Sequence, residues 1–207
     1  MMADNKPAKY AVPQTLGVAI PLLVVAIAVS LLAWRGYEPV LRLAAYQWAI
    51  SDTLDPADAV VVLGGGTPDR PHEAVELYFR GMASRILLDD DGDQKLVLGR
   101  NVPPQAVVMF GSGLRNTYEE SCALVDWAKK NGAQRFIIPT ELFSSRRVRW
   151  IFAHKLDDLG AHVVLDVVRP SRYTPDDWWL NRDGRAQFLT EIAKYFYYRV
   201  RYAFAQC

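Results

Sequence analysis

Five short apolar runs that alternate with helix-like stretches constrain the fold of this chain most. The runs span residues 59–63, 85–89, 106–110, 135–139 and 162–168. Apolar residues recur at helical spacing in the stretches 70–80, 117–130, 144–159 and 185–202. Strands that alternate with helices are typical of a doubly wound, mainly parallel sheet. The sequence therefore predicts an α/β fold with a Rossmann-like sheet of about five strands.

Glycines mark the expected ends of three of these helices. Gly81, Gly132 and Gly160 stand where glycine readily adopts the left-handed conformation that stops a helix. The segment 90–104 breaks the alternation, because its glycine and prolines predict a loop with at most a short helix. Ahead of the first strand, the spacing in 40–50 predicts a further helix.

An apolar segment near the N-terminus predicts one transmembrane helix ahead of the domain. No charged residue occurs from Ala11 to Trp34, a length that crosses a hydrocarbon core of about 30 Å. We interpret it as an uncleaved anchor; the alternative is a cleaved signal peptide, whose apolar core usually has about 7 to 15 residues. The expected organisation is a short tail (1–10), the anchor (11–35), a juxtamembrane helix and linker (36–57) and the α/β domain (58–207).

Composition limits the partners of this chain. Its 207 residues carry a net charge of +1, and basic and acidic residues are interspersed, so we expect no nucleic-acid partner. Cys122 and Cys207 are too few for a disulfide framework. Cys122 lies within an expected helix, where a small buried thiol is the predicted role.

Polar segments follow four of the expected strands. The segments 64–70, 89–93, 111–117 and 140–147 all fall at strand C-terminal ends, where open α/β sheets bind their ligands. Backbone N–H groups of Gly64, Gly65 and Gly66 suit an anion. The same glycines also suit a plain tight turn, so both interpretations stay open.

Residues that open two later helices indicate the same kind of ligand. Arg146 follows two serines at a helix start, where hydroxyl, guanidinium and backbone N–H groups are expected to point at one anion. Asn116 and Glu119 have the spacing of a helix cap. They either only cap the helix or also position the ligand.

The acidic segment 89–93 is either a solvated loop or a source of one or two Mg²⁺ ligands. It lacks the spacing of a calcium-binding EF-hand loop, and the three histidines show no ligand spacing. We therefore assign no metal site. The sequence also identifies no cofactor.

These motifs together resemble the YdcF/SanA/ElyC-like family of bacterial envelope proteins, a domain of unknown function. That family combines V-L-G-G-G, an Arg and an Ala on the first helix, L-Y-x-x-G, N-T-x-E-N and T-S-x-x-H-x-x-R. The matching residues here are 62–66, Arg70, Ala74, 77–81, 116–119, and Thr140 with Arg146. Three departures occur: residues 89–91 are all Asp instead of Ser-Gly-Gly, Glu120 replaces the second Asn, and Phe143 stands for the His, which removes an obvious general acid or base.

The resemblance implies a single-pass protein of the inner membrane with a periplasmic domain. Charges that flank the apolar segment nearly balance, so this orientation rests on the resemblance. The implied role is in lipid-linked sugar, polysaccharide or peptidoglycan carrier metabolism, with the bilayer, a small anionic ligand and envelope-assembly proteins as partners. A non-catalytic sensor of S-adenosylmethionine or a nucleotide, and an envelope scaffold, are the alternatives.

The expected site binds a small phosphorylated or nucleotide-like ligand. Asp89 and Glu119 are the candidate catalytic groups. The candidate ligand-binding residues are Gly64, Gly65, Gly66, Arg70, Asn116, Thr117, Glu119, Thr140 and Arg146.

Overall fold

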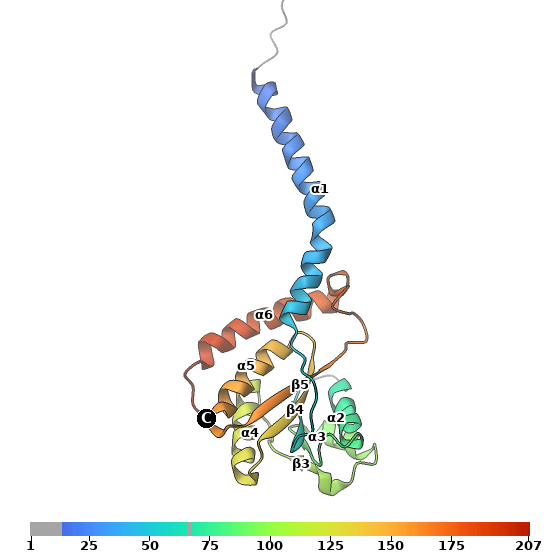
Figure 1. The fold of residues 1–207 in the computed structure, drawn as a ribbon, viewed down its shortest axis with the longest axis vertical. Helices are drawn as coiled ribbons and strands as arrows, with labels where there is room; N and C mark the ends of the chain where they lie inside the picture. The colour runs from blue at the N-terminus through green and yellow to red at the C-terminus, as the bar shows by residue number, and fades with distance from the viewer. Residues whose placement is uncertain (1–13, 66–67) are drawn as a thin grey trace, which may run out of the picture. The chain divides into compact units, whose positions relative to one another are not determined.

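The computed structural model describes residues 14–65 and 68–207, and the chain divides into two units, Met1–Leu41 and Arg42–Cys207. The first unit contains most of helix α1 (Gln14–Trp48) (Figure 1). Its part Leu22–Trp48 is long and apolar enough to cross a membrane by length and composition. Apolar side chains along it are largely exposed, with Leu32 at 72%. The expected helix over 40–50 is confirmed, because α1 continues to Trp48.

The second unit contains a five-stranded, all-parallel sheet, which confirms the predicted fold class. The strands are β1 (Ala59–Val62), β2 (Ile86–Leu88), β3 (Val107–Met109), β4 (Arg135–Glu141) and β5 (His162–Val168), in the order β3-β2-β1-β4-β5. All five expected runs form strands. Central β1 pairs with β2 through Val60 and Ile86, and with β4 through Ala59 and Phe136.

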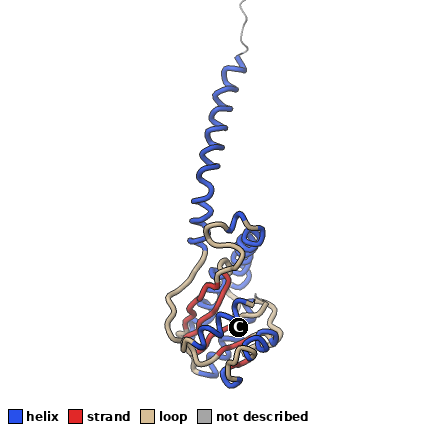
Figure 2. The backbone as a smooth tube through the Cα atoms, turned by 90° about the vertical axis from the view of Figure 1, so that its right-hand side faces the viewer, coloured by secondary structure: helices blue, strands red, loops and turns tan. Residues whose placement is uncertain are grey.

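Helices cover both faces of the sheet (Figures 1 and 2). One face is covered by α2 (Asp69–Phe79) and α3 (Asp91–Leu98), and the other by α4 (Thr117–Asn131) and α5 (Ser145–Leu156), on which α6 (Arg182–Tyr202) packs. Short 3-10 turns complete the fold at Pro104–Ala106, Asp157–Leu159 and Trp178–Leu180. Val61 joins one core while Val60 and Val62 join the other, since successive strand residues point to opposite faces.

Three helical segments end at the glycines that the sequence predicted as stops. Gly81, Gly132 and Gly160 have φ values of 73°, 64° and 60°, so each stop occurs where it was predicted. The segment 90–104 forms the short helix α3. The Asp90 side chain caps that helix by accepting a hydrogen bond from the Gly92 N–H at 2.6 Å. Most of the acidic segment is therefore the start of a helix rather than a loop.

The last turn of α1 belongs to the second unit and packs on α6. The Trp48 ring lies 5.5 Å from the ring of Tyr195 and 6.0 Å from that of Phe188. Its indole N–H donates to the Phe143 carbonyl at 2.8 Å. The chain thus enters the domain against α6.

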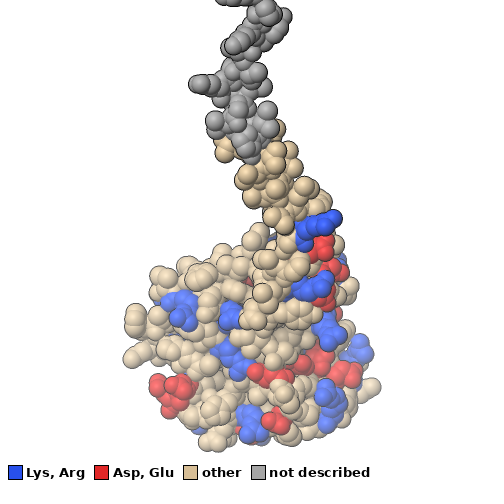
Figure 3. Space-filling model, turned by 45° about the horizontal axis from the view of Figure 1, so that its top comes forward, with Lys and Arg blue, Asp and Glu red and all other residues tan. Residues whose placement is uncertain are grey.

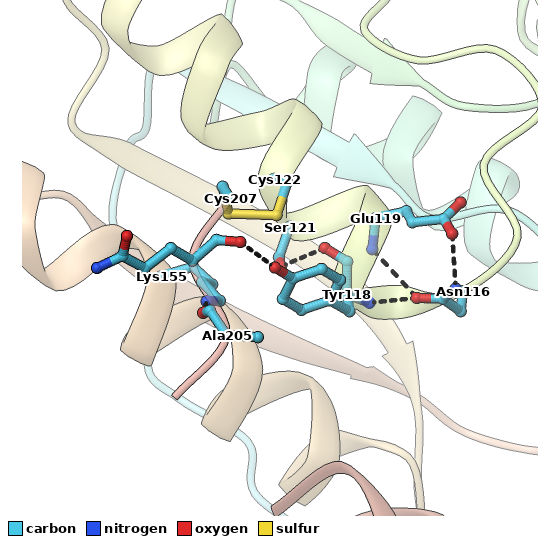
Figure 4. Close-up of a disulfide and its surroundings, with 9 residues drawn as sticks. Asn116, Tyr118, Glu119, Ser121, Cys122, Lys155, Ala205 and Cys207 are labelled. Carbon is cyan, nitrogen blue, oxygen red and sulfur yellow. Dashed lines mark hydrogen bonds between the residues drawn. A yellow bond between two sulfur atoms is a disulfide. The ribbon is translucent and has the colours of Figure 1, made fainter. Parts of the chain in front are cut away.

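A disulfide joins Cys122 to Cys207, so the predicted free, buried thiol is wrong (Figure 4). Their Cα atoms lie 5.2 Å apart, within the range that a disulfide spans. Tyr118 contacts the chain that leads to Cys207. Its ring stacks on that of Tyr202, with the ring centroids 4.4 Å apart, and its hydroxyl donates a hydrogen bond to the Gln206 carbonyl. Because 85 positions separate the two cysteines, only the path of the folded chain reveals the pair.

Candidate functional site

A cavity of about 440 Å³ opens at the C-terminal edge of the sheet. The direction in which strands are added reverses between β1 and β4, and ligands of open α/β sheets bind at such a switch point. The cavity is lined by the segment after β1, the first turn of α2, the end of β4, the starts of α4 and α5, and α6. The charged lining residues are Arg70, Arg115, Glu120, Glu141, Arg147, Glu191 and Lys194.

Asp89 follows β2 and fits between two glycine backbones. A Cβ at Gly64 would lie 2.7 Å from Asp89 Oδ2. One at Gly111 would lie 2.8 Å from Asp89 Oδ1 and even closer to Leu114 Cδ1. A side chain at either position would therefore force its neighbours to shift. Asp89 is only 7% exposed, and its Oδ1 has no hydrogen-bond partner among the described residues. Burial, and then the charges of Asp90 and Asp93, raise the pKa of Asp89 to about 6.

Glu120 reaches the same place from α4. Its Oε1 accepts a hydrogen bond from the Gly64 N–H at 2.7 Å, so this N–H binds the protein's own carboxyl group instead of an anionic ligand. Burial raises the pKa of Glu120 to about 7, and the nearby charge of Asp89 adds to the effect. The Gly64 N–H and Arg70 act in the opposite direction. Two carboxyl groups that titrate near neutrality therefore flank Gly64.

Arg70 brings a buried guanidinium group from the first turn of α2. Its Nη2 donates to the Gly64 carbonyl at 3.3 Å, and its Nε lies 3.8 Å from Glu141 Oε1. The residue is 8% exposed, and Nε has no hydrogen-bond partner among the described residues. A buried N–H without an acceptor is costly, so an acceptor from a ligand fits this position.

Arg147, at the start of α5, is held by residues of α4 and α6. Its Nε donates to Glu191 Oε2 at 2.7 Å and its Nη1 to Thr117 Oγ1 at 2.6 Å. Its guanidinium group stacks on the Tyr198 ring at 5.3 Å, and Lys194 also pairs with Glu191, at 3.0 Å. Burial raises the pKa of Glu191, but Arg147 and Lys194 outweigh this effect and hold it below its usual value.

Thr140 is the last but one residue of β4 and does not line the cavity. It is 1% exposed, and its hydroxyl shares a hydrogen bond of 2.9 Å with that of Ser144, which does line the cavity. Phe143 is fully buried in an aromatic cluster with Trp178 and Phe188 and lies away from the cavity.

Asn116 and Glu119 form the expected helix cap. Asn116 Oδ1 accepts hydrogen bonds from the N–H groups of Tyr118 and Glu119 at 3.1 and 3.2 Å (Figure 4). The Glu119 carboxylate binds Arg115 at 2.7 Å, and this hydrogen bond lowers the pKa of Glu119. Asn116 still lines the cavity, whereas Glu119 does not. Glu119 was the predicted catalytic candidate, but it is Glu120, the next residue, that lines the cavity.

Arg146 does not join the other predicted residues. Its guanidinium group donates to the carbonyl oxygens of Trp48, at 3.0 Å, and of Gln47, and thus satisfies the C-terminal end of α1. Arg146 therefore does not line this cavity, and its neighbour Arg147 does. The structure does bring together Gly64, Gly65, Arg70 and Thr117, whereas Gly66 lies outside the described residues.

The sequence contains signals for Ser144, Arg147 and Glu191, three cavity residues that were not predicted. Counted from Thr140, the spacing T-S-x-x-H-x-x-R places its Arg at Arg147 and its His at Ser144, each one position beyond the predicted match. Glu191 falls at helical spacing between Phe188 and Tyr195. An acidic residue on the apolar side of a helix is unusual, and this position was the signal for it. For Lys194 we find no comparable signal.

The charges of the cavity balance closely. Four basic side chains and three acidic ones line it, so the lining is net positive, and partial protonation of Glu120 near neutrality adds to the positive charge. Glu120, which lines the cavity and has a pKa of about 7, can exchange protons at neutral pH, as can Asp89, which has a pKa of about 6 and lies against Gly64 but outside the lining. No group of three or more potential metal ligands occurs within 14–65 and 68–207.

Comparisons with protein-family models, with curated proteins and with solved structures find no match for this chain.

Proposed function

We propose that this protein is a membrane-anchored envelope protein whose α/β domain binds a small phosphorylated or nucleotide-like ligand. The observation that carries the proposal is Arg70, which is 8% exposed at the switch point of the sheet. Its Nε lacks a hydrogen-bond partner among the residues described, and an oxyanion supplies the charged acceptor that such a group binds best.

The cavity also suits this class of ligand in size and lining. Its volume of about 440 Å³ falls within the usual range for small-molecule sites. Arg147 and Lys194 add positive charge, and Tyr197 and Tyr198 add aromatic surface for a base or sugar ring. A nucleotide or sugar phosphate has both kinds of group.

The disulfide supports a location outside the cytoplasm. Disulfides persist in oxidising compartments such as the bacterial periplasm and are rare in the cytosol. The Cys122–Cys207 bond therefore favours a periplasmic domain behind an α1 anchor in the inner membrane. With the family resemblance, this location favours a role in lipid-linked sugar, polysaccharide or peptidoglycan carrier metabolism, alongside envelope-assembly proteins.

Catalysis is a second candidate function, and the carboxyl groups of Asp89 and Glu120 favour it. Their raised pKa values suit a general base that accepts a proton at neutral pH. A sensor of S-adenosylmethionine or a nucleotide would bind without turnover. Each compound that binds is incubated with the protein and the products are analysed. Product formation indicates an enzyme, and binding without product indicates a sensor.

The binding proposal is tested with the full-length protein in lipid nanodiscs. Inorganic phosphate, pyrophosphate, nucleotides, sugar phosphates and S-adenosylmethionine are screened by thermal shift, because a ligand at 100 times its Kd stabilises by about 2.7 kcal/mol. We expect Arg70→Lys to weaken a hit by about 1.5 to 3 kcal/mol, since the fixed guanidinium geometry is lost. Arg80 is exposed at the C-cap of the same helix and provides the matched control, Arg80→Lys. Equal affinities of the two variants would contradict the assignment.

A further inference from the structure

Helix α6 exposes an apolar face to solvent. Its inner side buries Phe188 and Tyr198, as a helix packed on a core does. The opposite side carries large apolar residues at exposures of 57% to 98%. We call this side the outer face of α6; it consists of Leu189, Ala193, Phe196, Tyr197, Val200 and, just after the helix, Phe204. Contiguous apolar surface of this kind marks an interaction site.

Basic residues border the outer face. At 100° per residue, Lys194 and Arg201 fall along one edge, and Arg185 and Arg199 fall along the other. Within α6, all of which the structure describes, the acids are Asp183 in the first turn and the buried Glu191. Figure 3 shows a broad uncharged surface on the left of the domain with scattered Lys and Arg, while most of the visible Asp and Glu lie on the right. An apolar face with basic edges is typical of helices that lie in a membrane interface.

The last turn of α1, which follows the apolar segment, packs on α6. Trp48 packs on Tyr195 and Phe188, and Arg42 pairs with Asp176 at 3.0 Å in the same unit. Leu43 and Tyr46 between them are 58% and 55% exposed. From Arg35, where the uncharged segment has ended, helical chain reaches Trp48 over about 20 Å. A connection of this length lets α6 reach the surface of a bilayer that α1 spans.

We propose that the outer face of α6 lies in the interface of the bilayer that α1 spans. Leu189, Phe196 and Val200 enter the boundary between headgroups and acyl chains, and the basic edges meet anionic lipid headgroups. The inference rests on the membrane anchoring in the proposed function and adds a second membrane contact. Tyr197 belongs to both the outer face and the cavity lining, so the cavity opens beside the membrane.

Site-specific probes on the full-length protein test this contact. An environment-sensitive fluorophore is attached at Val200→Cys, at Asp126→Cys on exposed α4, and at Val29→Cys in α1, because both native cysteines are bonded to each other. The variants are placed in nanodiscs of phosphatidylcholine and phosphatidylglycerol with doxyl-labelled lipids. We expect quenching and a blue-shifted emission at positions 200 and 29, and neither at 126.

Two charge variants then test whether the apolar face causes the contact. Phe196→Glu is expected to abolish quenching at position 200, whereas Phe79→Glu, which changes a phenylalanine of 59% exposure on α2, leaves it unchanged. Quenching at 29 but not at 200 overturns the inference while the anchor stands, and absence at both positions rejects the anchor as well. Crosslinks between copies through position 200, without quenching, assign the face to a second copy and also overturn the inference.

Discussion

At the scale of single residues, neighbours along the chain have different tasks. Glu119 binds Arg115 at the helix cap, while Glu120 enters the cavity. Arg146 binds the end of α1, while Arg147 pairs with buried Glu191. On a helix, adjacent residues point about 100° apart, so a shift of one position exchanges a cavity residue for a surface residue. A site assigned from motifs must therefore be exact to the residue.

Glu120 is expected to make the stability of the domain depend on pH. Its folded pKa of about 7 lies above the ordinary 4.5, so the folded state holds more protons than the unfolded state between these values. Below pH 4.5 the carboxyl group is protonated in both states, and the free energy of unfolding does not depend on its titration. As the pH rises from 4.5 to about 7, the free energy of unfolding falls by about 3 kcal/mol. Glu120→Gln keeps the acceptor for the Gly64 N–H and should remove this loss.

The measurement is denaturant unfolding of the full-length protein at pH 5 and pH 8, followed by tryptophan fluorescence. Glu119→Gln is the control, because the pKa of Glu119 is lowered instead of raised and its removal leaves the decline in place. An equally steep decline in Glu120→Gln would show that Glu120 is not its source.

At the scale of elements, α6 completes the site and is itself fastened by the disulfide. It supplies Glu191, Lys194, Tyr197 and Tyr198 to the cavity. Its inner side packs on α5, and the segment that follows it is bonded to α4 through Cys122. The sequence predicted a helix over 185–202 but named none of its residues as part of the site. Its share of the cavity became visible only in the fold.

Loss of the disulfide is expected to destabilise the domain and loosen the end of α6. Disulfides typically contribute about 2 to 4 kcal/mol by restricting the unfolded chain, and a closed loop as long as this one, with the cysteines 85 positions apart, belongs at the upper end of that range. We expect Cys122→Ser to lower the free energy of unfolding by that amount and to speed hydrogen exchange in the last turns of α6. Reduction of the unmodified protein should have the same effect. Unchanged exchange in α6 would mean that packing on α5 alone holds it.

At the scale of the whole molecule, the expected topology has the tail inside and the domain outside the cytoplasm. An alkaline phosphatase fused after Cys207 through a linker should be active, and a green fluorescent protein at the same point should be dark. Alkylation of intact cells, with and without prior reduction, should find both cysteines oxidised, since disulfides persist in oxidising compartments. The opposite fusion results, or free thiols, would place the domain in the cytoplasm and reject a periplasmic role.

The sequence by itself determined the five strands, the positions of the helices other than α3, and the edge where the cavity opens. These depend on local properties, namely apolar periodicity, glycine stops and the rule that parallel strands end at one edge. Tertiary structure alone decided that Cys122 meets Cys207, that Lys194 reaches the cavity from α6, and that Arg146 serves the end of α1. These contacts join segments far apart in the chain, and their geometry depends on how helices pack.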